Sequence, residues 1–280
     1  MTIQWYPGHM TKSIRRMKEL ISLVDVVVEL LDARIPYSSK NPDIDTLAVN
    51  KRRIIVLNKS DLADPHITEK WSAYFRSQLY EVALVNSLSG KGVQQITPIA
   101  HNLMAEKIKR QKERGRVFTP IRAMVVGIPN VGKSSFVNRY VGGALTKTGD
   151  KPGVTRGQQW VKIKKDFELL DTPGILWPKF DDQNVGLNLA FTGALNDQIL
   201  DSYTLALKLI ECLQKLKPSA LTQRYNIQTE NKEAWQTMQD ICQARGFIMK
   251  GGLDTDRGAA ILLDEFRGGK LGRISLELPI

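Results

Sequence analysis

The sequence predicts an α/β fold: a doubly wound, mostly parallel sheet with one antiparallel edge, followed by a smaller all-helical domain. Two observations support the sheet. Short apolar runs rich in β-branched residues alternate with helical patterns over the first 170 residues or so, and the last two runs are close enough to form a hairpin. The third observation is that strand patterns stop beyond Trp177. We therefore expect one domain at residues 1–178 and a helical domain at 179–280.

The strands are predicted from short, mostly apolar runs bounded by turn residues, which are typical of buried strands. In chain order they are expected at residues 24–31, 53–57, 80–85, 121–126, 158–164 and 167–170. The helices are predicted from apolar residues that recur every three or four positions. They are expected at residues 11–23, 39–49, 67–78, 92–114, 134–140, 203–216, 234–245 and 255–266, whereas residues 221–230 show no clear pattern.

Composition is that of a soluble globular protein, with 42% hydrophobic and 25% charged residues among 280. The two cysteines, Cys212 and Cys242, have no C-x-x-C spacing and no nearby histidine. This argues against zinc and against a disulfide framework, and it suits a reducing, cytoplasmic setting. The longest apolar run, residues 20–31, contains two acidic residues and is too short to span a bilayer. We therefore expect no membrane association.

The net charge of +11 is unevenly distributed. Residues 1–180 contain 29 Lys and Arg against 16 Asp and Glu, whereas residues 181–280 contain 11 against 13. A polyanion-binding surface is therefore expected on the first part, with nucleic acid as the preferred partner. A solvated helix face is the alternative interpretation of the two basic clusters, which are Lys12, Arg15, Arg16 and Lys18, and then Lys107, Lys109, Arg110, Lys112, Arg114 and Arg116.

Residues 127–135 have the spacing of a phosphate-binding loop, G-x-x-x-x-G-K-[ST], between a predicted strand and a predicted helix. Backbone N–H groups in such a loop point toward an anion, and the helix N-terminus adds about half a positive charge. Lys133 would reach the β- and γ-phosphates, and the Ser134 hydroxyl would bind Mg²⁺. The candidate nucleotide-binding residues of this loop are Asn130, Val131, Gly132, Lys133, Ser134 and Ser135.

A second motif, N-K-S-D, follows the strand predicted at residues 53–57 and comprises Asn58, Lys59, Ser60 and Asp61. An aspartate here can accept hydrogen bonds from N1–H and N2–H₂ of guanine, whereas adenine would leave the carboxylate unpaired at a cost of about 1–3 kcal/mol. A capped turn is the alternative when the motif stands alone. After the next strand come Asn86 and Ser87, where a backbone N–H is expected to meet guanine O6.

A third group of residues is expected to bind Mg²⁺ and the γ-phosphate. Asp171 follows a predicted strand in the sequence D-T-P-G and would hold Mg²⁺ through water. The N–H of Gly174 would meet the γ-phosphate. Thr155, in the loop before the hairpin, is expected to act as a switch threonine that closes on Mg²⁺ and the γ-phosphate.

These motifs resemble those of translation-factor-class GTPases, but in a shifted order, because N-K-S-D precedes the phosphate loop. The chain looks like a circularly permuted GTPase. It resembles the YlqF family over essentially its whole length, through W-Y-P-G-H-M, D-A-R-I-P, N-K-S-D, G-I-P-N-V-G-K-S-S, P-G-V-T-R-G and D-T-P-G. One departure is Leu88, where alanine is common.

The resemblance implies a doubly wound P-loop GTPase sheet that binds GTP or GDP with Mg²⁺. It implies a factor in late assembly of the large ribosomal subunit that contacts rRNA from both domains. We expect a monomer. Intrinsic hydrolysis is expected to be slow and stimulated by the subunit. Because permutation cuts the chain after D-T-P-G, we also expect γ-phosphate contacts at Gly174 to set the orientation of the C-terminal domain.

Ile175 occupies the place where Ras-like enzymes have a water-orienting glutamine, and an aliphatic side chain cannot orient water. The resemblance assigns the catalytic role to His9, with a turn-stabilising surface histidine as the alternative. It also implies that Asn130 binds K⁺, which would replace an arginine finger; a loop-shaping hydrogen bond is the alternative there. Two other functions are weighed: a nucleotide-gated RNA-binding module with incidental hydrolysis, and an ATP-dependent kinase, which Asp61 disfavours.

Overall fold

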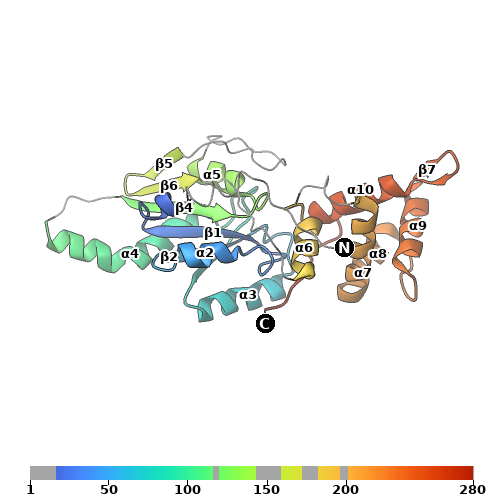
Figure 1. The fold of residues 1–280 in the computed structure, drawn as a ribbon, viewed down its shortest axis with the longest axis horizontal. Coiled ribbons are helices and arrows are strands. Elements are labelled where there is room, and N and C mark those ends of the chain that lie inside the picture. The colour runs from blue at the N-terminus through green and yellow to red at the C-terminus, as the bar shows by residue number, and fades with distance from the viewer. Residues whose placement is uncertain (1–16, 116–119, 143–158, 172–181, 196–200, 280) are drawn as a thin grey trace.

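A six-stranded sheet forms the centre of the first part of the chain in this computed structural model, which describes residues 17–115, 120–142, 159–171, 182–195 and 201–279 (Figure 1). The strand order is β3-β2-β1-β4-β6-β5, and only β5 runs antiparallel to its neighbour. This confirms the predicted doubly wound sheet with an antiparallel edge. The strands are β1 (Val26–Asp32), β2 (Arg52–Asn58), β3 (Glu81–Leu84), β4 (Ile121–Gly127), β5 (Gln159–Lys164) and β6 (Phe167–Asp171).

Helices cover both faces of the sheet, which is why its central strands are buried on both faces and mostly apolar. Glu29 of β1 is a buried exception and pairs with Arg53 of β2. Successive side chains of a strand point to opposite faces. In β1, Val28 packs in the cluster that includes α4 (Ile96–Glu113) and α5 (Lys133–Val141). Its neighbour Val27 instead packs with α2 (Pro42–Leu47), and Leu31 packs with α3 (Pro65–Ser77).

The start of α3 is set by local chemistry that also ends the N-K-S-D loop. Asp64 is the N-cap, and its carboxylate accepts hydrogen bonds from the backbone N–H groups of His66 and Ile67. Pro65 occupies the first helical position, where a missing N–H costs nothing. Asp64, three residues after Asp61, is therefore held in one conformation as the N-cap of α3.

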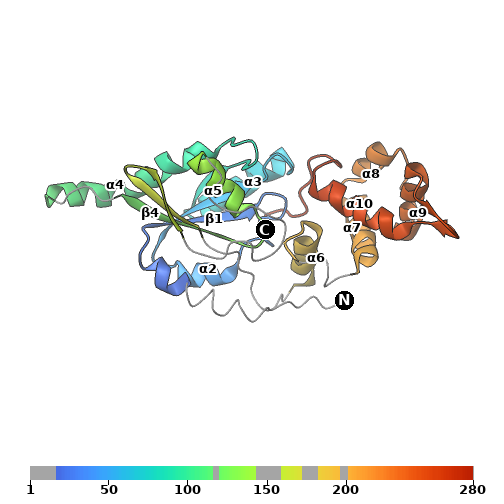
Figure 2. The same ribbon diagram turned by 90° about the horizontal axis from the view of Figure 1, so that it is seen from above.

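The second part of the chain contains five helices in the described residues, and both views place it to one side of the sheet (Figures 1 and 2). Three of them match the predicted helices closely. The other two, α6 and α8, were not predicted, because their sequences lack a clear apolar repeat. The helices are α6 (Gln183–Phe191), α7 (Ser202–Leu216), α8 (Pro218–Tyr225), α9 (Ala234–Arg245) and α10 (Thr255–Arg267).

A small hairpin qualifies the expectation that this part is all-helical. Strands β7 (Ile248–Met249) and β8 (Gly252–Leu253) pair antiparallel between α9 and α10. Two residues per strand are too few to show a period of two in the sequence. The domain boundary predicted at 178/179 lies outside the described residues.

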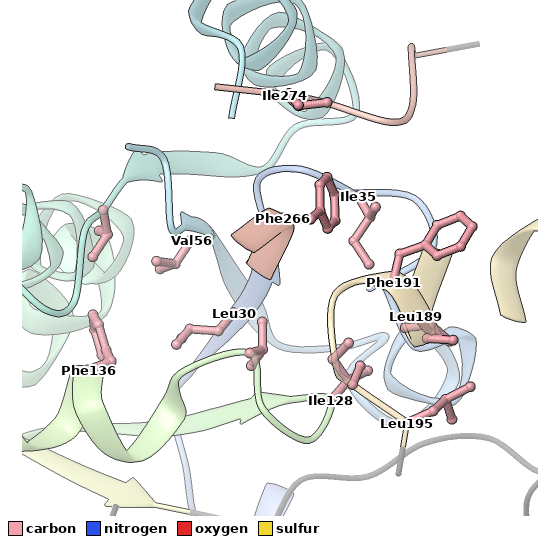
Figure 3. Close-up of a cluster of buried hydrophobic side chains, with 14 of the residues drawn as sticks. Leu30, Ile35, Val56, Ile128, Phe136, Leu189, Phe191, Leu195, Phe266 and Ile274 are labelled. Carbon is pink, nitrogen blue, oxygen red and sulfur yellow. The ribbon is translucent and has the colours of Figure 1, made fainter. Parts of the chain in front are cut away.

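The sheet and the helices share one hydrophobic core. Phe266 of α10, Phe191 of α6, Ile35 from the loop after β1 and Ile128 from the phosphate loop are all buried in the same cluster (Figure 3). Burying these side chains together stabilises the arrangement of the two parts, since each apolar side chain of this size contributes roughly 1.5–3 kcal/mol. The phosphate loop is thus packed directly against the helical part.

The chain returns to the sheet after α10, which the sequence did not predict. Residues 271–279 contain no helix or strand and run back toward α3 (Figure 1). The backbone N–H of Leu276 donates to the carbonyl of Arg34 at 2.9 Å, and the indole N–H of Trp71 donates to the carbonyl of Glu277 at 3.1 Å. We call residues 271–279 the C-terminal tail.

Across the described ranges, no helix is both long enough and apolar enough to cross a membrane.

Glu265 in α10 is the buried anion that joins three elements of the helical part. Its carboxylate accepts hydrogen bonds from Arg224 at 2.5 Å, Arg245 at 2.7 Å and the Tyr225 hydroxyl at 2.9 Å. The hydrogen bond from Arg224 lowers the pKa of Glu265 to about 2, against an opposing effect of burial. Because the folded-state pKa is depressed, the stabilisation is present above the ordinary value of about 4.5 and is lost as the pH falls toward 2.

Replacing Glu265 with Gln is expected to lower the free energy of unfolding at pH 7 by about 1–3 kcal/mol, because two partly buried arginines lose their charged acceptor. Urea denaturation followed by circular dichroism measures this. The matched control is Glu211→Gln, whose exposed pair with Lys208 is worth at most about 0.5 kcal/mol. Equal losses in both variants would contradict the role given to Glu265.

Candidate functional site

The predicted motifs meet at one edge of the sheet because the parallel strands all end there. Asp32 at the end of β1 is in register with Asn58 at the end of β2. The loops after β2, β3 and β4 contain the N-K-S-D residues, Asn86 with Ser87, and the phosphate loop, in that order. Asn58 and Val131, which are 73 positions apart in the sequence, are therefore neighbours in space.

The phosphate loop has the strand–loop–helix form that its sequence predicts. β4 ends at Gly127 and α5 begins at Lys133, with Gly132 as its N-cap at φ +101°. A Cβ atom at Gly132 would lie 2.4 Å from Nδ2 of Asn58, so this position requires glycine for space as well as for backbone conformation. The first turn of α5 contains Ser134 and Ser135, whose backbone N–H groups lie at a helix end suited to anions.

Lys133 is folded back onto the loop. Its side chain is 7% exposed, and its ammonium donates a hydrogen bond to the carbonyl of Ile128 at 2.7 Å. The same ammonium can exchange this carbonyl for phosphate oxygens, which are stronger acceptors because they are charged.

Asn58 connects three loops through one side-chain amide. Its Nδ2 donates to the carbonyl of Val131 at 2.8 Å, and its Oδ1 accepts from both the N–H (3.1 Å) and the hydroxyl (2.8 Å) of Ser87. Asn58 is buried, so losing these bonds would leave unpaired polar groups. Sequence reasoning placed Asn58 and Ser87 among the nucleotide-binding residues. The structure shows in addition that they bind each other.

Lys59 makes a second connection to the phosphate loop. Its ammonium donates to the carbonyl of Asn130 at 2.9 Å and forms a 3.0 Å ion pair with Asp32. Asp32 also accepts two hydrogen bonds from the buried guanidinium of Arg34, at 2.7 and 2.9 Å. Burial raises the pKa of Asp32, but the cations of Arg34 and Lys59 outweigh it, and the pKa lies well below its usual value.

Asp32 and Arg34 belong to the site but were not predicted as site residues. Their signal in the sequence was the strand-end motif D-A-R-I-P, to which no role was given. A buried charge of this kind needs partners on other elements, and the sequence does not show which elements those are.

Asp61 is exposed, and within the described residues its carboxylate makes no hydrogen bond or ion pair. The loop below it is fixed. The N–H and hydroxyl of Ser60 both donate to the carbonyl of Val85, at 3.2 and 3.1 Å. Asp61 therefore presents its carboxylate to solvent from a held backbone, as a base-recognition residue requires.

The loop after β3 is an Asx turn. The carboxamide oxygen of Asn86 accepts from the N–H groups of Leu88 and Ser89, both at 2.9 Å. The side chain of Leu88 is 77% exposed, so the departure from alanine leaves the packing of this loop unaffected. Arg139 of α5 donates to the carbonyl of Leu88 and holds the loop from the other side.

Asn130 joins the phosphate loop to the helical part. Its Nδ2 donates to the carbonyl of Gly193, just after α6, at 2.8 Å. This contact is of the loop-shaping kind weighed against K⁺ binding. The backbone of Asn130 is left-handed, at φ +55°, a conformation that asparagine tolerates better than most residues.

Four predicted site residues are only partly described, or not described at all. His9, Thr155 and Gly174 lie outside the described residues. Asp171 ends β6, where its backbone is in register with Val125 of β4, next to the phosphate loop. The backbone register thus brings Asp171 to the same edge of the sheet as the other motifs.

Comparisons with known proteins agree with this arrangement. A family profile described as 50S ribosome-binding GTPase matches residues 122–240, beginning at β4. Among curated proteins, ribosome biogenesis GTPase A of Bacillus cereus is 45% identical, with 100% of this chain and 95% of that protein covered. Ribosome biogenesis GTPase A of Thermotoga maritima is 30% identical, with 99% and 95% covered.

Solved structures give the same result. The chain is similar to YlqF from Thermotoga maritima in its GDP-bound form, with a TM-score of 0.67, 27% identity, and 95% of this chain and 99% of that one covered. The GNP-bound crystal structure of YlqF has the same TM-score and identity. Identity of 45% over the full length, together with the permuted motif order on a P-loop sheet, shows that this chain belongs to the ribosome biogenesis GTPase A (YlqF) family.

Proposed function

We propose that this chain binds and hydrolyses GTP as a factor in late assembly of the large ribosomal subunit. The observation that carries the proposal is the joining of three loops at one edge of the sheet by Asn58 and Lys59, with Asp61 exposed beside them. The names of the relatives supply the setting, since they are ribosome biogenesis and ribosome-associated GTPases.

Guanine is proposed as the base because a carboxylate at Asp61 matches the two neighbouring donors of guanine. The phosphates would lie on the N–H groups of residues 130–135, where Lys133 would leave the carbonyl of Ile128 and bind phosphate oxygens instead. Asn86 and Ser87 would place a backbone N–H near O6 of the base.

The residues at this edge fit Mg²⁺. Within the described residues there is no cluster of three or more His, Cys, Asp or Glu side chains that would hold a metal by itself. Mg²⁺ is instead typically held by one or two protein oxygens together with nucleotide phosphates. Ser134 in the first turn of α5 and Asp171 at the end of β6, the neighbour of β4, would supply these oxygens, and Thr155 would complete the set. When bound, Mg²⁺ neutralises charge on the phosphates.

Hydrolysis would proceed by in-line attack of water on the γ-phosphate. Lys133 and the loop N–H groups would stabilise the charge that develops on the phosphate oxygens. Because Ile175 cannot orient water, we propose His9 as the catalytic group and K⁺ bound at Oδ1 of Asn130 as an additional fixed charge. Intrinsic turnover is expected to be slow, with stimulation by the large subunit.

A basic groove offers a surface for rRNA. It has a volume of about 740 Å³ and lies at the other edge of the sheet, where β1 and β2 begin. Its walls come from the residues before these strands and from the C-terminal half of α4. The cations that line it are Lys51, Arg52, Lys107, Arg110 and Arg114.

Two of these cations form ion pairs for which phosphates can compete. Lys107 pairs with Asp25, and Arg110 lies 3.8 Å from Glu106, an exposed pair that a polyanion can replace at little cost. Positive charge gathered in a groove attracts a polyanion more strongly than the same charge spread over a surface. The groove therefore supports the nucleic-acid partner expected from net charge.

We further propose that the helical part, residues 179–280, responds to nucleotide. The contact of Asn130 with Gly193 links the phosphate loop to this part, and Gly174 would add a γ-phosphate contact on the segment between them. The second candidate, a nucleotide-gated RNA-binding module with incidental hydrolysis, is favoured by one observation, the absence of glutamine at position 175.

Replacing Asp61 with Asn is expected to weaken GTP and GDP binding by a factor on the order of a hundred and to create binding of xanthosine nucleotides, whose base offers an acceptor where guanine has a donor. Isothermal titration calorimetry with GDP and xanthosine diphosphate measures both effects. Retention of GDP affinity would refute the guanine assignment.

Large ribosomal subunits are expected to accelerate GTP hydrolysis by at least about tenfold, and the stimulated rate should be higher in KCl than in NaCl. Phosphate release measured with and without subunits, in each salt, tests both expectations. His9→Ala should keep GDP affinity and lose the stimulated rate. His66→Ala, a change at an exposed histidine at the start of α3, is the matched control. Rates that do not respond to subunits would favour the RNA-binding module.

Removing two groove cations by Arg110→Ala and Arg114→Ala is expected to weaken rRNA binding and to make the binding constant less dependent on salt. The slope of its logarithm against the logarithm of the salt concentration should fall by about one unit for each phosphate that the variant no longer neutralises. Filter binding over a range of KCl concentrations gives this slope. Lys208→Ala with Lys215→Ala, which removes the same charge from α7, should leave it unchanged.

A further inference from the structure

The C-terminal tail forms hydrogen bonds to the loop that contains Asp61. The guanidinium of Arg273 donates from Nε to the carbonyl of Ala63 at 2.8 Å and from Nη2 to the carbonyl of Ser60 at 2.9 Å. These two carbonyls flank Asp61 on either side. We call residues 58–64 the guanine loop, after the function proposed above.

Two further bonds continue the same contact. The N–H of Ile274 donates to the carbonyl of Leu62 at 2.9 Å, and the hydroxyl of Ser275 accepts from the N–H of Asp64 at 3.1 Å. Four main-chain groups of the guanine loop are thus satisfied by three consecutive tail residues. Main-chain polar groups in a loop need such partners if the loop is to keep one conformation. If these groups were bonded only to water, the loop could adopt many conformations.

The tail is itself anchored to other elements. The carboxylate of Glu277 accepts from the N–H groups of Tyr37 (2.8 Å) and Ser38 (3.1 Å) and from the amide of Asn188 in α6 (2.9 Å). Ile274 is buried in the shared core. The ammonium of Lys217, between α7 and α8, donates to the carbonyl of Arg273 at 2.9 Å. The position of Arg273 therefore depends on how the helical part is seated.

We propose that the C-terminal tail is a positioning element for the guanine base: Arg273 holds the guanine loop in the shape that presents Asp61, so that seating of the tail and binding of guanine nucleotide favour each other. Arg273 is a positioning residue, since it touches the loop and not the base. The inference rests on the proposed role of Asp61.

The geometry of base recognition explains why the position of the guanine loop matters. A carboxylate that accepts two parallel hydrogen bonds from one base must lie in the plane of that base and at the right distance from both donors. If the loop moves slightly, the carboxylate can keep one of these hydrogen bonds and lose the other. Coupling of this kind is reciprocal, so a nucleotide that fixes the guanine loop must also fix the tail to the same extent.

The test compares Arg273→Ala with Lys270→Ala, a change that removes the same charge from an exposed side chain three residues earlier. Dissociation constants are measured for GDP and for inosine diphosphate, whose base lacks the exocyclic amino group. In Arg273→Ala the constant for GDP should rise on the order of tenfold and that for inosine diphosphate clearly less, so the preference for GDP shrinks. Arg273→Lys should fall between, since one amine cannot reach both carbonyls in the same way. Lys270→Ala should match the wild type.

A loss of affinity that is equal for the two nucleotides would overturn the inference, because it would show general damage to the site. Unchanged affinities would overturn it as well. Thermal melting establishes that each variant is folded. If Arg273→Ala does not fold, Ser275→Ala removes the acceptor for Asp64 by a smaller change, and the same comparison decides.

Hydrogen exchange in the wild-type protein tests the reciprocal effect. GDP should slow exchange at the N–H groups of Ile274 and Leu276, which donate to Leu62 and Arg34, and leave α9 unchanged. Exchange in the tail that does not respond to GDP would count against the coupling. Asp61→Asn separates the two ideas: if it keeps GDP affinity, the proposed base assignment fails, whereas if it loses GDP and Arg273→Ala does not, only the role of the tail fails.

Discussion

The amide of Asn58 is the contact on which the site depends. It is buried at the end of β2 and bonds to Val131 in the phosphate loop and to Ser87 in the loop after β3. Gly132 must lack a side chain because Asn58 occupies that space. One side chain therefore sets the spacing between the segments proposed to bind the base and the phosphates. This spacing must match the length of one nucleotide, because the base and the phosphates have to be bound at the same time.

Circular permutation changes the order of the chain but is compatible with this contact. The sheet order β3-β2-β1-β4 places the early strands and the P-loop strand side by side, whichever comes first in the sequence. Parallel strands end at the same edge, so any order of strands and helices that keeps these neighbours brings the same loops together. What permutation changes is where the two ends of the chain lie in the fold. In this protein the C-terminal tail comes back to α3 and the guanine loop, and Glu277 fastens it there.

The two edges of the sheet differ in the function proposed for them. The carboxyl edge contains the nucleotide loops and the buried pair of Asp32 and Arg34. The amino edge contains the basic groove formed with α4. Separation of this kind allows a polyanion to bind without competing for the phosphate site. It also means that a signal between the two must pass through the sheet or through the helical part, whose core is continuous with the phosphate loop.

The sequence by itself determined the fold class, the order of the six strands of the sheet along the chain, and the loops that form the site, because buried parallel strands and phosphate loops have strong local patterns. It determined neither α6 nor the hairpin of β7 and β8, whose patterns are weak or short. Only the tertiary structure decided that Asn58 binds Ser87, that Asp32 holds Lys59, and that Arg273 grips the guanine loop. These contacts join residues far apart in the chain, and their partners follow from strand order and core packing, which no local pattern records.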